Sequence, residues 1–264
     1  MAKSGSIIER LLNTILEKNG IKHCPQITDP IISVDVTTTA IIGRKGVGKT
    51  STVHSLFEKS STGKGSWNLK TREDGVEEIV YEDDYFKISV IDMPGIESGL
   101  NNNSDVLSLY KTVLPNCNSI IYIIDSCASD IDRDIEIIKN KIVPIIQEAR
   151  GTHNIVIAFN KIDSIGRLFP EYNTNKEYHW DRTNNKPTAT LSKLIEDRLM
   201  DIYSWVIKEN VQVDLVSPVY SAECSFGLNN LLYAILNLKN RKCDGSFLND
   251  TKLAKWSDKK LKAK

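Results

Sequence analysis

Six short apolar runs alternate with longer mixed segments along this chain, and this alternation limits the folds open to it. The runs are rich in Ile and Val, which is typical of strands buried on both faces. They cover residues 36–43, 77–81, 86–92, 119–125, 154–160 and 213–220. Helical candidates lie between them at residues 50–59, 104–114, 130–149, 190–209 and 227–238. The pattern predicts a doubly wound α/β fold with a mostly parallel six-stranded sheet. The short turn at Asp83–Asp84 predicts one antiparallel strand, because only antiparallel neighbours are joined so directly.

The periodic segments fit one domain over residues 36–238 with an extension at each end. The 264 residues carry 34 Lys plus Arg and 34 Asp plus Glu, so the formal net charge is zero. We expect an N-terminal helical extension over residues 1–35, whose apolar stripe (residues 5–19) either docks on the domain or contacts a membrane or partner. A basic tail over residues 239–264 holds nine Lys or Arg and three Asp. A tail of this kind is usually a solvated end, and contact with anionic lipid or RNA is the alternative.

Composition excludes several other classes of protein. No stretch approaches the 18 apolar residues that a transmembrane helix needs. The five cysteines are scattered and never spaced C-x-x-C, which argues against a disulfide framework or a zinc site. A reducing cytoplasm is the simplest setting, with peripheral membrane contact left open. The balanced charge argues against bulk affinity for nucleic acid.

Two stretches break the alternation. Residues 60–75 are polar and Gly-rich, which predicts a mobile loop. Residues 166–190 form an insertion without periodicity that contains four aromatic residues, Phe169, Tyr172, Tyr178 and Trp180. These aromatics either cover the edge of the sheet or form a surface for a partner.

Residues 43–50 match the pattern G-x-x-x-x-G-K-[ST] between an apolar run and a helical segment. Glycines let successive backbone N–H groups face inward, and the helix N-terminus adds positive potential, so this stretch predicts a phosphate-binding loop. Lys49 is expected to contact the β- and γ-phosphates and Thr50 to ligate Mg²⁺. The residues expected to bind nucleotide here are Gly43, Arg44, Lys45, Gly46, Val47, Gly48, Lys49, Thr50 and Ser51.

Asp92-Met93-Pro94-Gly95 stands at the end of the next apolar run and forms a D-x-x-G motif. The motif is weak alone but has a role in this position. Asp92 can support the metal through water, and the Gly95 N–H can meet the γ-phosphate. Loss of that phosphate would release the turn, so the motif predicts a switch element.

Asn160-Lys161-Ile162-Asp163 follows a later apolar run and predicts base recognition. The Asp163 carboxylate can accept hydrogen bonds from N1–H and the amine of guanine, whereas adenine would leave it unpaired. The Lys161 stem can lie along the base. A second, weaker element is Ser221-Ala222-Glu223, where small residues would let a backbone N–H approach the guanine oxygen.

These four elements, in this order, resemble the GTPases of the translation-factor-related class, with the Era/TrmE-type branch as the nearest likeness over residues 36–238. The segment at residues 46–53 also resembles the corresponding segment of septin-like and AIG-type GTPases. The resemblance implies a fold that binds GTP and GDP, dependence on Mg²⁺, slow intrinsic hydrolysis and switching loops. It implies catalytic roles for Lys49, Thr50, Thr71 and Gly95, and metal binding by Thr50, Thr71 and Asp92.

The resemblance also brings alternatives and departures. Thr71, which precedes Arg72, fits the family's switch threonine better than Thr62 does. Ile96 stands where many GTPases carry a water-orienting Gln, so slow hydrolysis is expected unless a partner or second copy contributes. Gly46 replaces the Asn of potassium-activated relatives, which weakens the case for potassium-stimulated dimerisation. Four charged residues near the phosphates are expected to be solvated loop charges: Arg44, Lys45, Lys64 and Glu97.

The sequence therefore predicts a guanine-nucleotide switch that hydrolyses GTP slowly and acts with an unknown effector or activating protein. Its ordering elements would be residues 60–75 and 95–104. The alternative is a septin- or AIG-like assembly module, in which a nucleotide-dependent homodimer forms and hydrolysis is incidental.

Overall fold

A computed structural model describes residues 37–57, 66–73, 76–82, 87–96, 104–150, 155–209, 215–228 and 231. Several predicted features lie outside these residues. They are the N-terminal helix at 5–19, the candidate switch threonine Thr62, the charged residues Lys64 and Glu97, the turn at Asp83–Asp84, most of the helix at 227–238, and the tail at 239–264.

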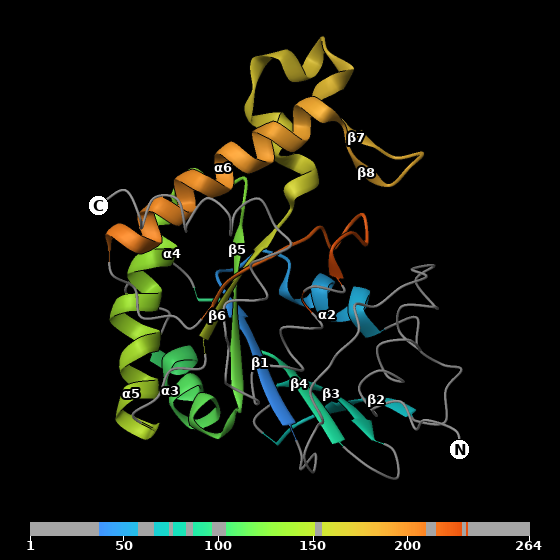
Figure 1. Ribbon diagram of the computed structural model, residues 1–264. Coiled ribbons are helices and arrows are strands. Elements are labelled where there is room, and N and C mark those ends of the chain that lie inside the picture. Colours follow the sequence, from blue (N-terminus) through green and yellow to red (C-terminus); the bar gives the residue numbers. More distant parts are fainter. Residues whose placement is uncertain are drawn as a thin grey trace, which may run out of the picture.

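A seven-stranded sheet with the order β2-β3-β4-β1-β5-β6-β9 forms the centre of the fold (Figure 1). The strands are β1 (Thr37–Gly43), β2 (Ser66–Thr71), β3 (Glu77–Glu82), β4 (Lys87–Asp92), β5 (Ser119–Asp125), β6 (Ile155–Asn160) and β9 (Leu215–Val219). Only β3 runs against the others, since β2 and β4 both pair antiparallel to it and the remaining pairs are parallel. The predicted doubly wound, mostly parallel sheet with one antiparallel strand is confirmed.

The edge strand β2 is a correction to the sequence analysis, which assigned residues 60–75 to a loop. Residues 66–71 pair along their whole length with β3, from Ser66 opposite Glu82 to Thr71 opposite Glu77. The segment is polar and its described side chains are exposed at Leu69, Lys70 and Thr71. An edge strand needs no apolar alternation, because only one of its sides is hydrogen-bonded and its faces can remain in water.

Helices cover both faces of the sheet. They are α2 (Lys49–Phe57), α3 (Ser104–Val113), α4 (Ile131–Ile137), α5 (Val143–Arg150) and α6 (Ala189–Lys208). In Figure 1, α3, α4 and α5 lie to the left of the sheet and α2 to the right. Side chains alternate along β1: Ala40 and Ile42 belong to the core shared with α3, α4, α5 and α6, whereas Ile41 points to the other face. No helix in the described part of the chain is long and apolar enough to cross a membrane.

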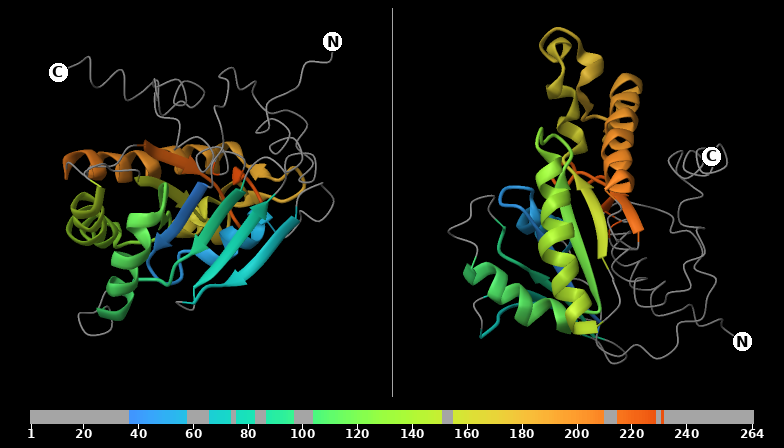
Figure 2. Two further views of the ribbon diagram at one scale, coloured as in Figure 1. Left: turned by 90° about the horizontal axis from the view of Figure 1, so that it is seen from below. Right: turned by 90° about the vertical axis from the view of Figure 1, so that its left-hand side faces the viewer.

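The predicted helix at residues 130–149 is present with an irregularity at its centre. One π turn at Ile138–Ile142 joins α4 to α5. Pro144 follows it, and a proline inside a helix offers no N–H and crowds the carbonyl four residues before it. The wider turn accommodates this, and the combined helix lies along the sheet in the right-hand view of Figure 2.

The insertion is ordered and projects beyond the ends of β5 and β6 (Figures 1 and 2). It consists of three 3₁₀ segments, Ile162–Leu168, Pro170–Asn173 and Lys176–Tyr178, and a hairpin of β7 (Trp180–Asp181) and β8 (Lys186–Pro187). Trp180 is buried and meets Phe226 edge-on with ring centroids 5.0 Å apart, while Tyr172 stacks on His179 at 4.0 Å. Part of the aromatic cluster is therefore used for internal packing.

Candidate nucleotide site

Every predicted site motif within the described residues follows a strand at its carboxyl end. The phosphate-loop motif follows β1, the D-x-x-G motif follows β4, and the N-K-x-D motif follows β6. β1 lies between β4 and β5, its neighbours in the parallel part of the sheet. Ligands of such folds bind outside the carboxyl ends of the strands, where the strand order reverses. The topology thus brings motifs more than 100 residues apart to one edge.

The loop at residues 43–50 has the backbone of a phosphate-binding loop. Gly43, Gly46 and Gly48 all have positive φ, at 145°, 81° and 95°. A Cβ on Gly48 would lie 2.4 Å from Asn160 Nδ2, so a side chain there would push the base-binding motif away. The loop runs into α2, whose first turn is closed by the Thr52 N–H, which donates to the Gly48 carbonyl at 2.9 Å. The helix N-terminus therefore faces the loop, as anion binding requires.

Lys49 is buried and turned back into the loop. Its Nζ donates to the Arg44 carbonyl at 3.0 Å. Burial lowers the pKa of Lys49, and the nearby charge of Asp92 opposes that effect. A Cβ placed on Gly95 would lie 3.0 Å from Lys49 Nζ and 2.8 Å from the Lys45 backbone nitrogen. The D-x-x-G turn therefore lies against the phosphate loop.

Two predicted metal residues meet. The Thr50 hydroxyl donates to Asp92 Oδ2 at 2.5 Å. The other carboxylate oxygen, Asp92 Oδ1, is buried and has no hydrogen-bond partner among the described residues. Burial raises the pKa of Asp92, against the opposing effects of the Thr50 hydrogen bond and the Lys49 charge. Hydroxyl and carboxylate oxygens are the donors that Mg²⁺ prefers, and an orphaned oxygen beside them fits a metal-bound water.

The third predicted metal residue, Thr71, does not join them. It ends β2, is exposed, and pairs with Glu77, which in turn pairs with Asp92. Two strand spacings of about 4.8 Å separate Thr71 from Asp92 in this arrangement. Thr71 lies at the same end of the parallel strands as Thr50 and Asp92, but the structure does not bring it to their contact.

The D-x-x-G turn is fixed from both sides. The Tyr110 hydroxyl on α3 donates to the Pro94 carbonyl at 2.7 Å. The Ile96 N–H donates to the Gly43 carbonyl at 3.2 Å, and its side chain is fully buried in the core. A buried isoleucine has no polar group that could orient water, and the slow hydrolysis expected from Ile96 stays a prediction. Sequence reasoning missed Tyr110, which no motif marks.

Asn160 and Lys161 connect the base-binding motif to the phosphate loop. Asn160 Nδ2 donates to the Val47 carbonyl at 2.9 Å, and Lys161 Nζ donates to the Gly46 carbonyl at 2.7 Å. Lys161 Nζ also lies 2.7 Å from Asp125 Oδ2 at the end of β5. Lys161 has the left-handed backbone, with φ of 64°, that lets the chain turn sharply after β6. The two motifs therefore form one connected unit.

The two carboxylate oxygens of Asp163 differ in their hydrogen bonding. Its Oδ2 accepts from the Ser164 hydroxyl at 3.0 Å. Its Oδ1 is buried and has no hydrogen-bond partner among the described residues. An orphaned buried acceptor costs about 1–3 kcal/mol, more for a charged group, so such an atom indicates a missing donor. The arrangement fits the donor edge of guanine.

The element at residues 221–223 also contacts the N-K-x-D motif. The Ala222 N–H, one of the backbone groups that the sequence predicted near the guanine oxygen, donates to Asn160 Oδ1 at 3.1 Å. Ser221 is buried, and its hydroxyl accepts from the Cys224 N–H at 3.0 Å. Glu223 is exposed and lies 4.0 Å from Arg182 of the insertion. Ala222 thus orients Asn160 in this structure.

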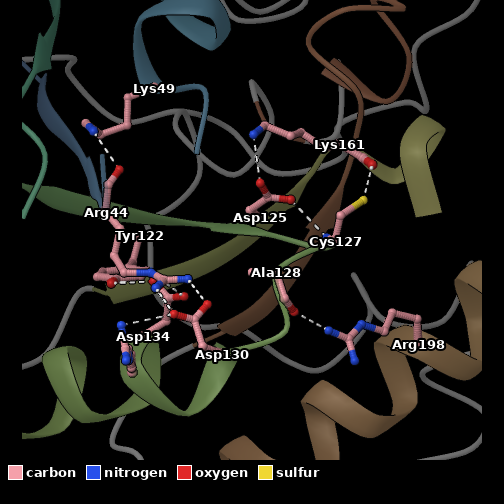
Figure 3. A network of polar contacts seen from close by, with 11 residues as sticks. Arg44, Lys49, Tyr122, Asp125, Cys127, Ala128, Asp130, Asp134, Lys161 and Arg198 are labelled. Carbon is pink, nitrogen blue, oxygen red and sulfur yellow. Dashed lines mark hydrogen bonds and ion pairs between the residues drawn. The ribbon is translucent and has the colours of Figure 1, made fainter. Parts of the chain in front are cut away.

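The loop after β5 contributes contacts that the sequence analysis did not single out. Asp125 Oδ1 accepts from the Cys127 N–H at 2.9 Å, and the Cys127 thiol donates to the Lys161 carbonyl at 3.4 Å (Figure 3). Burial, together with the charges of Asp125 and Asp163, raises the pKa of Cys127 to about 12, so its thiol stays protonated. Arg198 on α6 donates through Nε to the Ser126 carbonyl at 3.1 Å. The sequence offered one signal for these contacts: Asp125 is an acidic residue at the end of a buried apolar run.

Arg44 is not the solvated loop charge that the sequence predicted, because its side chain leaves the loop and is only 13% exposed. It reaches α4, where its two terminal nitrogens donate to Asp130 at 2.8 and 2.9 Å and its Nε lies 3.0 Å from Asp134 (Figure 3). Ser51 is exposed on the first turn of α2. Of the predicted loop residues, Arg44 therefore contributes its backbone rather than its guanidinium.

Solved structures similar to this chain are G domains with low sequence identity. Aquifex aeolicus Era bound to GDP and aluminium fluoride is 20% identical, with a TM-score of 0.47. The match covers 77% of this chain and 56% of that one, so this chain spans little more than half of the Era structure. The FeoB G-domain of Methanococcus jannaschii is 18% identical, with a TM-score of 0.46, over 79% and 100% of the two chains. The putative nucleolar GTP-binding protein 1 of Plasmodium falciparum is 18% identical, with a TM-score of 0.46, over 88% and 97%.

Curated protein sequences gave no match to this chain. The family comparison gave one. The Gtr1/RagA G protein conserved region matches residues 39–199, which is more than half of the chain and includes the phosphate loop, the D-x-x-G motif and the N-K-x-D motif. This chain belongs to the Gtr1/RagA family of G proteins.

Proposed function

We propose that this protein binds GTP and GDP with Mg²⁺, hydrolyses GTP slowly and acts as a nucleotide-dependent switch. The observation that carries the proposal is Asp163 Oδ1, a buried carboxylate oxygen with no hydrogen-bond partner among the described residues, in a motif that is hydrogen-bonded to the phosphate loop. The base-binding and phosphate-binding motifs are joined through Asn160 and Lys161, so one ligand would occupy both.

Asp163 would select the base. Guanine offers two adjacent donors, N1–H and the exocyclic amine, to one carboxylate, and charge-assisted hydrogen bonds of this kind are the strong ones. Adenine offers neither donor in that arrangement, so an adenine nucleotide would leave Asp163 Oδ1 unpaired. Lys161 would lie along the base while its Nζ remains bound to Gly46 and Asp125.

Lys49 and the loop N–H groups would hold the phosphates, with Thr50 and water on Asp92 as the metal-binding groups. When bound, Mg²⁺ supplies positive charge to the β- and γ-phosphate oxygens. To hold it, the Thr50 hydroxyl would have to give up its hydrogen bond to Asp92 Oδ2. Lys49 would turn from the Arg44 carbonyl toward the β–γ bridge, and the Gly95 N–H would meet the γ-phosphate. Thr71 would complete the metal site in the GTP state.

Slow hydrolysis follows from Ile96. Its side chain is buried, so the described residue after Gly95 cannot orient a water for attack. A partner would have to contribute the missing polar group, as activating proteins do for other switch GTPases. We therefore propose an effector or activating protein whose identity is open.

Finer parts of the proposal rest on the sequence alone. Membership of an Era/TrmE-like branch rests on the resemblance, a cytoplasmic location on the scattered cysteines, and contact of residues 239–264 with a membrane or RNA on their basic charge. The assembly alternative, in which a homodimer forms on nucleotide binding, rests on the resemblance to septin-like and AIG-type GTPases.

Nucleotide binding and single-turnover hydrolysis test the function together. We expect the wild-type protein to bind GDP and GTP, to bind ADP and ATP at least about 100-fold more weakly, and to hydrolyse GTP slowly only with Mg²⁺. Failure to bind GDP would overturn the proposal, and equal binding of ATP would overturn the role of Asp163.

The protein concentration in the same assay separates the switch from the assembly module. A slow rate per molecule that is independent of concentration supports a switch that waits for a partner. A rate that rises steeply with concentration supports nucleotide-dependent assembly. Light scattering recorded in parallel with GDP and with a non-hydrolysable GTP analogue checks whether a dimer forms in either state.

A further inference from the structure

The Arg44 guanidinium connects the phosphate loop to α4 through two carboxylates. Its terminal nitrogens form a two-point contact with Asp130 at 2.8 and 2.9 Å, and Nε lies 3.0 Å from Asp134 Oδ2. Tyr122 of β5 donates its hydroxyl to the second Asp134 oxygen at 2.8 Å. The directional contact is the one with Asp130, because Nε and Asp134 Oδ2 are close enough for an ion pair but neither atom makes a hydrogen bond to a described residue (Figure 3).

The contacts of Arg44 with the two carboxylates are largely buried. The side chains of Arg44 and Asp134 are 13% and 0% exposed, whereas Asp130 is 38% exposed at the surface. The hydrogen bond from Arg44 lowers the pKa of Asp130. Burial raises the pKa of Asp134 to about 6, against the opposing effects of Tyr122 and Arg44. Removing one partner of a buried ion pair leaves the other uncompensated, so the position of Arg44 is strongly determined.

The backbone of the same residue holds two parts of the phosphate site. The Arg44 carbonyl accepts from Lys49 Nζ at 3.0 Å. Arg44 also forms a parallel β-bridge with Ile96, the residue directly after the D-x-x-G turn. A change in the Arg44 backbone would therefore displace both the lysine and the turn.

We propose that Arg44 is a positioning residue that, anchored by Asp130 and Asp134, sets the phosphate loop for Lys49 and the D-x-x-G turn. This inference rests on the proposed binding of guanine nucleotides. It assigns the guanidinium a role behind the loop rather than on the γ-phosphate, where an arginine finger would act. The affinity for both GDP and GTP should then depend on Arg44, because both ligands use the loop.

The test compares Arg44→Ala with Arg133→Ala. Arg133 also pairs with Asp130, at 3.4 Å, but its side chain is 54% exposed and it belongs to α4, so its loss leaves the phosphate loop untouched. We expect Arg44→Ala to weaken binding of GDP and GTP roughly 10- to 100-fold, as small displacements in a site can. The preference for guanine over xanthine nucleotides should not change, because Asp163 is untouched. Arg133→Ala should stay within about twofold of wild type, as exposed ion pairs contribute little.

Arg44→Lys distinguishes positioning from charge. Lysine keeps the positive charge but cannot make the two-point contact, so its affinity for GDP should fall between wild type and Arg44→Ala. Should Arg44→Ala fail to fold, Asp130→Asn is the second variant, because it removes the exposed carboxylate that pairs with Arg44. It should weaken the binding of both GDP and GTP, by a smaller factor than Arg44→Ala.

Three results would overturn the inference. Unchanged GDP affinity with a large fall in kcat would make Arg44 an arginine finger. A lower Tm with unchanged GDP affinity of the folded protein would make it purely structural. Equal effects of Arg44→Ala and Arg133→Ala would remove the special role of the loop contact. Absence of GDP binding in the wild type would instead reject the proposed function, which the same titration shows separately.

Discussion

The two halves of the nucleotide site differ in how far they are assembled. On the base side, Asn160 and Lys161 are bound to the phosphate loop, and Asn160 also accepts from the Ala222 N–H. On the phosphate side, the groups that would serve the ligand are bound to one another. Thr50 is bound to Asp92, and Lys49 to a backbone carbonyl.

This difference indicates which half of the site must rearrange when a nucleotide binds. The base side offers one open acceptor, Asp163 Oδ1, and need not exchange its internal bonds. The phosphate side also has one open oxygen among the described residues, Asp92 Oδ1, but Thr50 and Lys49 must release internal hydrogen bonds before they contact metal or phosphate. A preformed base side favours affinity because few groups remain to be ordered when the ligand binds. A phosphate side that exchanges partners can respond to the γ-phosphate, which is what a switch needs.

The largest expected effect comes from changing Asp163, whose Oδ1 is the open acceptor on the base side. Asp163→Asn replaces an oxygen acceptor by an amide that is partly a donor, while its size is kept. Two charge-assisted hydrogen bonds to guanine are lost, so GDP affinity should fall about 1,000-fold. Xanthine nucleotides, which offer an acceptor at that position, should bind the variant better than guanine nucleotides do. Competition titrations with GDP and XDP measure both.

Ser164→Ala is the matched control for that exchange. It removes only the hydroxyl that donates to Asp163 Oδ2 and leaves the carboxylate in place. A loss of about threefold to tenfold in GDP affinity is expected, the value of one ordinary hydrogen bond. If Asp163→Asn kept its preference for GDP over XDP, the base side would not be the preformed reader that we infer.

On the phosphate side, Lys49→Ala should weaken binding of both GDP and GTP by about 100-fold, since it removes a charge-assisted contact to the phosphates. The guanine preference should survive, because Asp163 and Asn160 lie on the other half of the site. Lys193→Ala, an exposed lysine on α6, is the control for the change in net charge. Unchanged nucleotide affinity in Lys49→Ala would contradict the assignment of the phosphate loop.

The sequence predicted the parts of the site that are contiguous in the chain. Residues 43–50 and 160–163 each follow a buried strand, and Ile- and Val-rich strands are recognisable without their neighbours. The parallel sheet then places both motifs at one edge, which is why their meeting could be expected.

What the sequence did not predict depends on partners far apart in the chain. Arg44 and Asp130 are separated by 86 positions, and neither stands out from other charged residues until α4 is placed beside the loop. The Ala222 N–H could be assigned to guanine from its position, but packing gives it to Asn160. The edge strand β2 was missed because a polar strand at a sheet edge has no apolar periodicity to reveal it.

The smallest expected effect concerns Thr71, and it tests whether the phosphate side rearranges at all. Thr71 is paired in the β2–β3 ladder two strands from Asp92, and the Arg72 N–H donates to the Val76 carbonyl at 2.9 Å. To bind the metal in the GTP state, this end of β2 would have to leave the ladder. Thr71→Ala should then raise the Mg²⁺ concentration needed for binding a GTP analogue about tenfold, the loss of one ligand contact. GDP binding should not change.

Thr62→Ala is the paired variant, since Thr62 is the other candidate for the same role. Hydrogen exchange gives an independent measure: amides near Thr71 should exchange faster with the GTP analogue and Mg²⁺ than with GDP, because their ladder bonds open. An Mg²⁺ effect in Thr62→Ala but not in Thr71→Ala would assign the switch to Thr62. An effect in neither, with equal exchange in both nucleotide states, would show that the phosphate side is as fixed as the base side, and the contrast between the two halves would no longer hold.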